Sequence, residues 1–423
     1  MRKKFTLFVM LFFAVGLSAQ QAHVYTWEEC AKTALTGNHE LLSSKERIEQ
    51  SKAAKGTARS VMLPSINANA GIDRSKSGAG NQGAKNNYSY GLNGRQLLFD
   101  GLESYYNLKS ADADIETSNY GYIVTSSSVR MSLKTAFISL LRAQEMVRIL
   151  EEIQTRRKHV MDLVKMKYDA GSEHRGSYYS ARADFLSAQA AVKSAKREVG
   201  LAKKTLSFLM GISEENDFAV KGDIKTALAY NDKPDLNTIA VNNPVYLRSA
   251  SETNAALLSM QASKAAFSPQ LSASGNIGRS GPELDEMNTG WSVGLAVSAP
   301  LFSGGSTWYS YKRSEAMYNQ MVLNEKTTKN DVLKSLEESW NNLIDSIENV
   351  DVQKAVLDAN IERSRIGEAQ YSIGTLAFDN WTIIENNLSN AQRSYLEACA
   401  QALVSEARWI NSLGGTLDNE ISN

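Results

Sequence analysis

Residues Tyr88 to Gly101 read Tyr-Ser-Tyr-Gly-Leu-Asn-Gly-Arg-Gln-Leu-Leu-Phe-Asp-Gly, and a similar stretch, Trp291 to Gly304, follows 203 positions later. Both stretches alternate large apolar residues with small or polar ones, and both end at a Leu-Phe-x-Gly corner. A period of two predicts a β-strand whose two faces meet different surroundings. Because the pattern occurs twice, we expect a fold built from one repeated unit.

Each of these strands follows a second alternating segment, so each is expected to form one arm of a β-hairpin. The expected hairpins cover residues 65–99 and 270–302, and Pro64 and Pro269 stand directly before them. Proline ends a helix readily, so these two residues mark the entry from helix into strand.

Two helices without proline are expected after each hairpin, at residues 102–167 and 176–210 in the first half and 305–370 and 376–413 in the second. Apolar residues in the first helix recur at steps of four and three, at Val129, Leu133, Ala136, Leu140, Ala143, Val147 and Leu150. This heptad seam predicts packing as a coiled coil. At 1.5 Å per residue, helix 102–167 would span on the order of 100 Å.

The expected organisation is one unit present twice, each copy beginning with a further helix. Residues 1–19 combine basic residues, a short apolar run and small residues, which is typical of a signal peptide. The first repeat then covers 20–211, a polar connector 212–235, the second repeat 236–414, and a C-terminal tail 415–423.

The composition gives no sign of an enzyme, a cofactor or a nucleic-acid partner. Lys plus Arg equals Asp plus Glu at 46 each, and a balanced charge does not favour nucleic acid. The four histidines lack metal-ligand spacing, and neither a nucleophile elbow nor a Walker lysine is present. A G-x-G-x-x-G match at residues 78–83 lacks the following helix that a pyrophosphate would need, so we interpret it as an exposed turn.

The two cysteines, Cys30 and Cys399, stand far apart in an exported chain. We expect two free, packed thiols, although a disulfide between them stays open at the level of sequence.

Two hairpins give four strands, too few to close a barrel, and an open sheet edge cannot face lipid. The barrel must therefore be shared: two chains would make eight strands, and three would make twelve and leave room for a channel. We predict a mainly helical protein whose antiparallel coiled-coil helices form a tunnel below a twelve-strand barrel in a homotrimer. A solid, non-conducting trimeric envelope stalk is the structural alternative.

The chain resembles the TolC-type outer-membrane efflux proteins over essentially all of its mature length. The resemblance rests on the twofold repeat and on three pairs of short motifs. The strand entries are Leu63-Pro64 and Pro269, and the corners after the strands are Leu98 to Gly101 and Pro300 to Gly305. The helix-tip signature is Tyr168-x-x-Gly171 and Tyr371-x-x-Gly374. It implies a trimeric channel of the cell outer membrane, with its helical part in the periplasm.

The resemblance also implies partners. Such channels dock to a periplasmic adaptor and an inner-membrane RND or ABC transporter, and they contact outer-membrane lipid. Small-molecule efflux is the expected function, and type I protein secretion is the alternative within transport. Docking would use the helix tips, which here contain Gly171, Arg175, Gly374, Thr375 and Leu376.

Family members often close the periplasmic tip with inward aspartates six and nine residues after the second tip glycine, and six after the first. The corresponding residues here are Asn380, Ile383 and Ser177, so the acidic ring is missing at these positions. Ile383 would instead suit a hydrophobic constriction. Asp379 lies one residue from the expected register and is either a gate residue or a solvated acid on the outer face.

Overall fold

The computed structural model describes residues 23–76, 84–212, 218–224, 230 and 232–420. The expected signal peptide and the glycine motif at 78–83 lie outside these residues. The elements are, in order, β1 (His23–Tyr25), α1 (Trp27–Gly37), α2 (His39–Ser60), β2 (Ser65–Ser75), β3 (Lys85–Phe99), α3 (Glu103–Asp169), α4 (Arg175–Met210), β4 (Phe218–Val220), α5 (Leu236–Val241), α6 (Pro244–Ala265), β5 (Gln270–Gly281), β6 (Asn288–Ser298), α7 (Ser306–Ser372), α8 (Phe378–Ser412) and η1 (Asp418–Glu420).

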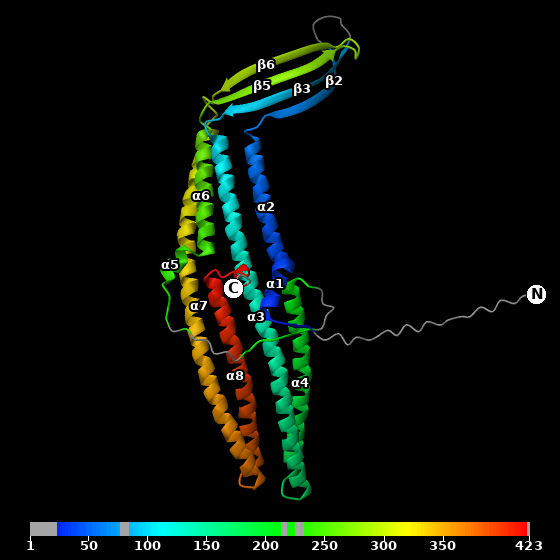
Figure 1. The fold of residues 1–423 in the computed structure, drawn as a ribbon, viewed down its shortest axis with the longest axis vertical. Helices are drawn as coiled ribbons and strands as arrows, with labels where there is room; N and C mark the ends of the chain where they lie inside the picture. The colour runs from blue at the N-terminus through cyan, green and yellow to red at the C-terminus, as the bar shows by residue number, and fades with distance from the viewer. Residues whose placement is uncertain (1–22, 77–83, 213–217, 225–229, 231, 421–423) are drawn as a thin grey trace, which may run out of the picture.

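The molecule is long and narrow, with a four-stranded sheet at one end and two helical tips at the other (Figure 1). Helices α3 and α7, each of 67 residues, run from the sheet to the tips. Helix α3 packs on α2 near the sheet and on α4 near the tip, and α7 packs on α6 and α8 in the same way. The second half thus repeats the layout of the first.

The sheet has the order β2-β3-β5-β6, and all three pairings are antiparallel. Contact between β3 and β5 joins the two hairpins into one surface. Strands β2 and β6 stand at the edges and have no second partner strand among the described residues.

In each repeat, an asparagine side chain joins the short helix near the sheet to the helix that comes up from the tip. Asn38 caps α2 by accepting from the Leu41 backbone N–H, and its Nδ2 donates to the Leu209 carbonyl of α4 at 2.9 Å. In the second repeat Asn243 caps α6, and its Nδ2 donates to the Ser412 carbonyl of α8 at 2.7 Å. Each asparagine therefore satisfies a helix start and a helix end together.

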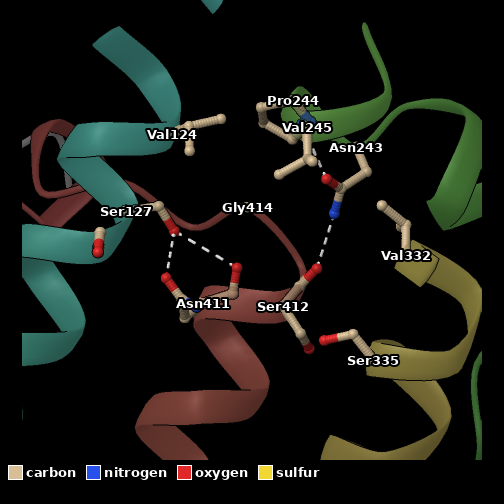
Figure 2. Close-up of a pocket in the computed structure, with 11 residues that line it drawn as sticks. Val124, Ser127, Asn243, Pro244, Val245, Val332, Ser335, Asn411, Ser412 and Gly414 are labelled. Carbon is tan, nitrogen blue, oxygen red and sulfur yellow. Dashed lines mark hydrogen bonds between the residues drawn. The ribbon is translucent and has the colours of Figure 1, made fainter. Parts of the chain in front are cut away.

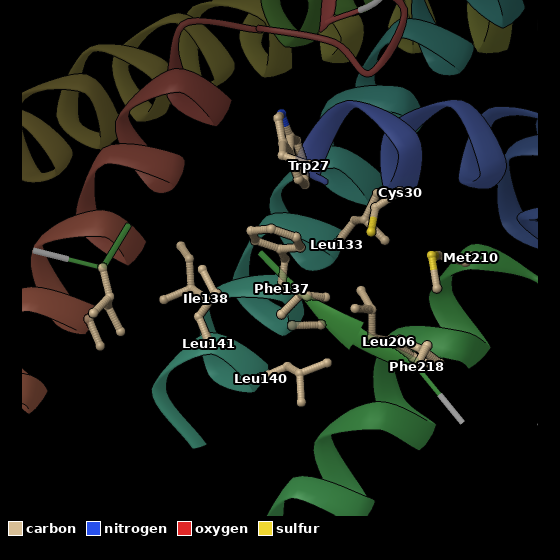
Figure 3. Close-up of a cluster of buried hydrophobic side chains, with 14 of the residues drawn as sticks. Trp27, Cys30, Leu133, Phe137, Ile138, Leu140, Leu141, Leu206, Met210 and Phe218 are labelled. Atoms are coloured by element: carbon tan, nitrogen blue, oxygen red, sulfur yellow. The ribbon is translucent and has the colours of Figure 1, made fainter. Parts of the chain in front are cut away.

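The largest apolar core surrounds these junctions in the first repeat (Figure 3). The predicted seam supplies part of it, since Leu133 and Leu140 have no exposed surface. The seam residues Val147 and Leu150 are only half-buried, and burial moves to Ile149 and Ile153. An α-helix has 3.6 residues per turn, so a 3.5-residue seam drifts around a helix that stays straight. The expectation of packed cysteines without a disulfide between them is confirmed, because Cys30 and Cys399 are buried and unbridged.

The connector and the tail are more ordered than their composition indicates. Strand β4 of the connector pairs in parallel with β1, at the start of the described chain. Beyond α8 the tail turns back onto the first repeat, where Leu417 is completely buried. Glu420 accepts hydrogen bonds from Trp27 Nε1 at 2.8 Å and from Arg130 Nε at 2.6 Å. These contacts close the chain into a single body.

Candidate functional site

The two helix tips have the same backbone geometry. Gly171 follows α3 with φ of 77°, and Gly374 follows α7 with φ of 82°. In each tip the glycine N–H and the next N–H donate to carbonyls of the last helical turn, the arrangement of a Schellman motif. A left-handed conformation favours glycine because it has no Cβ atom, so the tip glycines are explained by the turn itself.

The first tip presents aromatic and basic side chains. Arg175, the first residue of α4, is exposed and donates to the Tyr179 hydroxyl at 3.1 Å. That hydrogen bond is the main reason why the pKa of Tyr179 is lowered. Beside this pair, the rings of Tyr168 and Tyr178 stack with centroids 6.1 Å apart.

The second tip presents aliphatic side chains instead. Ile373 is 76% exposed at the turn, although no motif in the sequence marks it as a candidate. Thr375 is exposed and its hydroxyl donates to the Gln370 carbonyl at 3.0 Å, whereas Leu376 is half-buried in the tip core. The two tips therefore offer different chemistry to a partner.

Tyr371 joins the two tips and was missed as a functional candidate. Only 2% of this residue of α7 is exposed, and its ring stacks on Trp381 with centroids 4.3 Å apart. Its hydroxyl donates to Glu173 at 3.1 Å, and its carbonyl accepts from Lys167 Nζ at 2.6 Å. Both partners belong to the first tip, so this contact ties the α7–α8 pair to the α3–α4 pair.

Glu173 is the acceptor at the centre of this link. Burial alone would raise its pKa, but hydrogen bonds from the His174 N–H, Ser177 and Tyr371 outweigh burial and lower it. The carboxylate is thus held in its ionised form. Burial, followed by the hydrogen bond to Glu173, raises the pKa of Tyr371 well above its usual value and keeps it protonated as a donor.

Arginines of α3 tie α8 to the first repeat above the tips. Arg142 bridges Glu198 of α4 and Glu397 of α8, with N to O distances of 2.7 and 2.6 Å. Further down, Arg156 approaches Glu385 of α8 at 3.6 Å, and Ser364 of α7 donates to the same carboxylate. Glu385 is only 4% exposed, and a buried carboxylate needs such partners.

Three of the predicted gate residues share one region of α8. Asp379, Asn380 and Ile383 are all exposed, and Ile383 has 54% of its surface free. Ser177 differs, because only 1% of it is exposed and its hydroxyl bonds Glu173 at 2.9 Å. Within the chain, Ser177 therefore stabilises the tip turn.

Asn380 and Ile383 begin an exposed stripe along α8. Its members recur at steps of three and four, at Asn380, Ile383, Asn387, Asn390, Ser394, Glu397 and Gln401. We call this set the α8 stripe. Its one charged member, Glu397, is paired with Arg142. A groove of about 720 Å³ follows the part of the stripe from Asn390 to Gln401, and Arg393 together with Asn349 and Gln353 of α7 also lines it. Ile383 is the only apolar residue of the stripe.

The sheet has one apolar and one polar face. The register places Ala68, Leu92, Ile277 and Trp291 side by side across the four strands. One position along, Asn67, Asn93, Asn276 and Ser292 form the neighbouring row, and successive residues of a strand point to opposite faces.

A small cavity of about 190 Å³ lies where α8 ends, between α3, α6 and α7 (Figure 2). Its lining contains serines, asparagines and aliphatic residues but no charged side chain. Ser127 donates to Asn411 Oδ1 at 3.0 Å, so polar groups of the wall bond one another. The cavity is therefore a packing gap at the junction between the repeats and does not indicate a binding site.

In the described ranges, no helix is long and apolar enough to cross a membrane. The same residues contain no cluster of His, Cys, Asp or Glu that could hold a metal ion.

Comparisons with known proteins give a consistent result. The family model described as "Outer membrane efflux protein" matches residues 30–212 and 236–415, one match for each repeat. TolC of Vibrio cholerae is 21% identical, covering 95% of this chain and 94% of that protein. The toluene efflux pump outer membrane protein TtgF of Pseudomonas putida is 21% identical, covering 92% and 83%.

Solved structures support the same fold. A crystal structure of CusC superposes with a TM-score of 0.84 at 16% identity, covering 92% of each chain. The open state of the MtrE outer membrane channel of Neisseria gonorrhoeae gives a TM-score of 0.81 at 18% identity, covering 92% of this chain and 89% of that one.

Proposed function

The chain belongs to the outer membrane efflux protein family, and we propose that it works as a homotrimeric channel-tunnel that conducts substrates out of the cell. It is a transport protein of the outer membrane and not an enzyme.

The sheet carries the proposal. Its two edge strands, β2 and β6, expose backbone N–H and C=O groups that need partners if the apolar face meets lipid. Pairing β6 of one chain with β2 of the next satisfies both edges. Three chains then supply twelve strands, which enclose a channel, whereas eight strands would be filled by side chains.

We propose that the α8 stripe lines the tunnel. Its residues are exposed in the single chain and are mostly uncharged, which suits a wall that meets water and solutes of either charge. Near the tip, Ile383 of three chains would form a hydrophobic constriction, with Asn380 and Asp379 beside it. The buried position of Ser177 supports a structural role for that residue.

The tips are the proposed docking surface for a periplasmic adaptor that connects to an inner-membrane RND or ABC transporter. The exposed Arg175–Tyr179 pair suits an acidic or aromatic contact, and the exposed Ile373 suits an apolar one. An adaptor would thus meet two unlike surfaces, Gly171 to Arg175 and Gly374 to Leu376, on every chain.

Native mass spectrometry of the detergent-solubilised protein tests the assembly. We expect a species of three chains, and a stable monomer or dimer would contradict the proposal. Dye efflux from cells that depend on this channel tests docking. Arg175→Glu should raise dye retention, whereas Arg182→Glu, an exposed residue two turns along α4, should leave it unchanged. Equal effects of both variants would contradict the docking surface.

A further inference from the structure

A hollow of about 630 Å³ interrupts the apolar face of the sheet. Most of its lining comes from β2, β3 and β5, and Thr289 of β6 completes it. The small side chains of Ala68 and Ala70 lie beside the larger Tyr90 and Leu92. The hollow is therefore apolar over most of its length. We call it the β2–β3–β5 groove.

One charged side chain lines this groove. Arg279 pairs with Tyr90 across β3 and with Thr289 across β6, on the same face as the apolar residues. Its Nη2 donates to the Met287 carbonyl at 2.9 Å. A guanidinium has five N–H donors, and within the described ranges no carboxylate pairs with Arg279. Glu283, Asp285 and Glu286 of the adjacent turn form no ion pair with it in the described part of the chain.

The position of Arg279 along the strand matters. Gln270 begins β5 next to the helices, so Arg279 lies nine residues further, about 30 Å along the strand at 3.3 Å per residue. Because β5 ends at Gly281, Arg279 lies near the last residues of this strand, and Figure 1 shows that this end of the sheet is remote from the helices. The groove is also complete within one chain, because the unpaired outer edges of β2 and β6 are not needed to form it.

We propose that the groove holds an acyl chain of an outer-leaflet lipid whose phosphate binds Arg279. The proposal rests on the proposed function, because it requires the apolar face to meet the membrane. The chemistry is complementary at both ends: methylene groups fill the apolar hollow, and an anionic phosphate accepts from a guanidinium at the depth of the headgroups. Three equivalent sites follow for a trimer.

Native mass spectrometry of the trimer with added phosphatidylglycerol measures this binding directly, with phosphatidylcholine as the neutral comparison. Arg279→Gln should weaken phosphatidylglycerol binding about fivefold, the effect of one cationic side chain near an anionic lipid surface. Arg279→Lys should retain most of the binding, and Ala70→Leu should weaken both lipids by filling the hollow. Arg95→Gln is the matched control, because Arg95 is on the opposite face of β3.

A second route does not need Arg279 to be replaced. Thr289→Glu places a carboxylate opposite Arg279 in the register and should reproduce the loss. Equal phosphatidylglycerol binding in wild type, Arg279→Gln and Thr289→Glu would overturn the proposal, and so would full competition by inorganic phosphate. Conductance of the same preparations distinguishes failure of the lipid site from failure of the proposed function. Trimers that conduct but show no preference for phosphatidylglycerol would overturn only the lipid site. Chains that neither trimerise nor conduct would overturn the proposed function.

Discussion

Replacing Tyr371 with phenylalanine should loosen the link between the two tips. The change keeps the buried ring, which stacks on Trp381, and removes only the hydroxyl that donates to Glu173 at 3.1 Å. A hydrogen bond to a charged group contributes about 1.5–3 kcal/mol. Because Glu173 keeps donors from His174 and Ser177, we take the lower end, about 1.5 kcal/mol.

A loss of this size changes an equilibrium about tenfold. If the tips must separate for conduction, Tyr371→Phe should raise the fraction of time that single trimers spend open by about that factor in planar bilayers. Tyr178→Phe is the control, since the Tyr178 hydroxyl has no hydrogen-bond partner among the described residues. Glu173→Gln completes a double-mutant cycle.

The pH dependence follows from Glu173. The pKa of Glu173 is lowered below the usual 4.5 in the folded protein. Its ionised carboxylate therefore stabilises the link fully at pH values above its pKa in the unfolded chain, and this stabilisation is lost as the pH falls through its pKa in the folded protein. The effect of Tyr371→Phe should therefore be full at neutral pH and shrink in acid below about pH 4. An unchanged open fraction at neutral pH, or additive effects of Tyr371→Phe and Glu173→Gln, would refute the link.

Three further predictions concern stability and reactivity. Leu417→Ala should lower the stability of the folded protein by about 2–5 kcal/mol, because it truncates a fully buried leucine. The midpoint of thermal dissociation of the trimer measures this loss, with the exposed Asn419→Ala as the control. Equal midpoints for the two variants would contradict a structural role for the tail. Gly211→Ala should destabilise the protein far more than Gly171→Ala. An added Cβ atom would lie 2.0 Å from the Gly37 carbonyl oxygen at position 211 but in open space at position 171. Comparable denaturant midpoints for the two variants would contradict this expectation. Burial raises the pKa of Cys30 to about 12, so its thiol should resist maleimide at pH 8 until the protein unfolds, and rapid labelling of folded trimers would contradict the packing.

Much of the fold was predictable because its signals are local. The alternation after Tyr88 and after Trp291 specifies strands, and the structure pairs both in one antiparallel sheet. The second strand ends at Ser298, before the expected bound of 302, because Pro300 cannot donate to a ladder. The tip glycines were predictable for the same reason, since a left-handed residue after a helix favours glycine. The repeat then extended each local signal to the other half of the chain, and the matching family model and channel structures confirm the fold class.

Contacts between distant segments were not predictable from these signals. Nothing local in His23–Tyr25 indicates a parallel partner at Phe218–Val220, and three-residue strands carry too few residues to show a period. Residues 415–423 were predicted only as a C-terminal tail, and no local signal indicates that Glu420 accepts a hydrogen bond from Trp27, 393 positions away.

The candidate site divides in the same way. The family resemblance singled out Asn380 and Ile383, a spacing of three keeps them on one face of a helix, and the structure exposes both. Ser177 lies at the equivalent position in the first repeat but is buried, because Glu173 and His174 of its own turn draw its hydroxyl inward. The corresponding residues of the second turn, Leu376 and Ala377, have no side-chain acceptor.

Single-channel conductance of purified trimers in planar bilayers tests the central claim most directly. Wild type should show a small conductance that rises in Ile383→Gly, which removes the apolar side chain from the α8 stripe, and changes little in Asn380→Ala. Absence of conductance in all three, from correctly inserted trimers, would contradict a gated tunnel and favour a solid stalk.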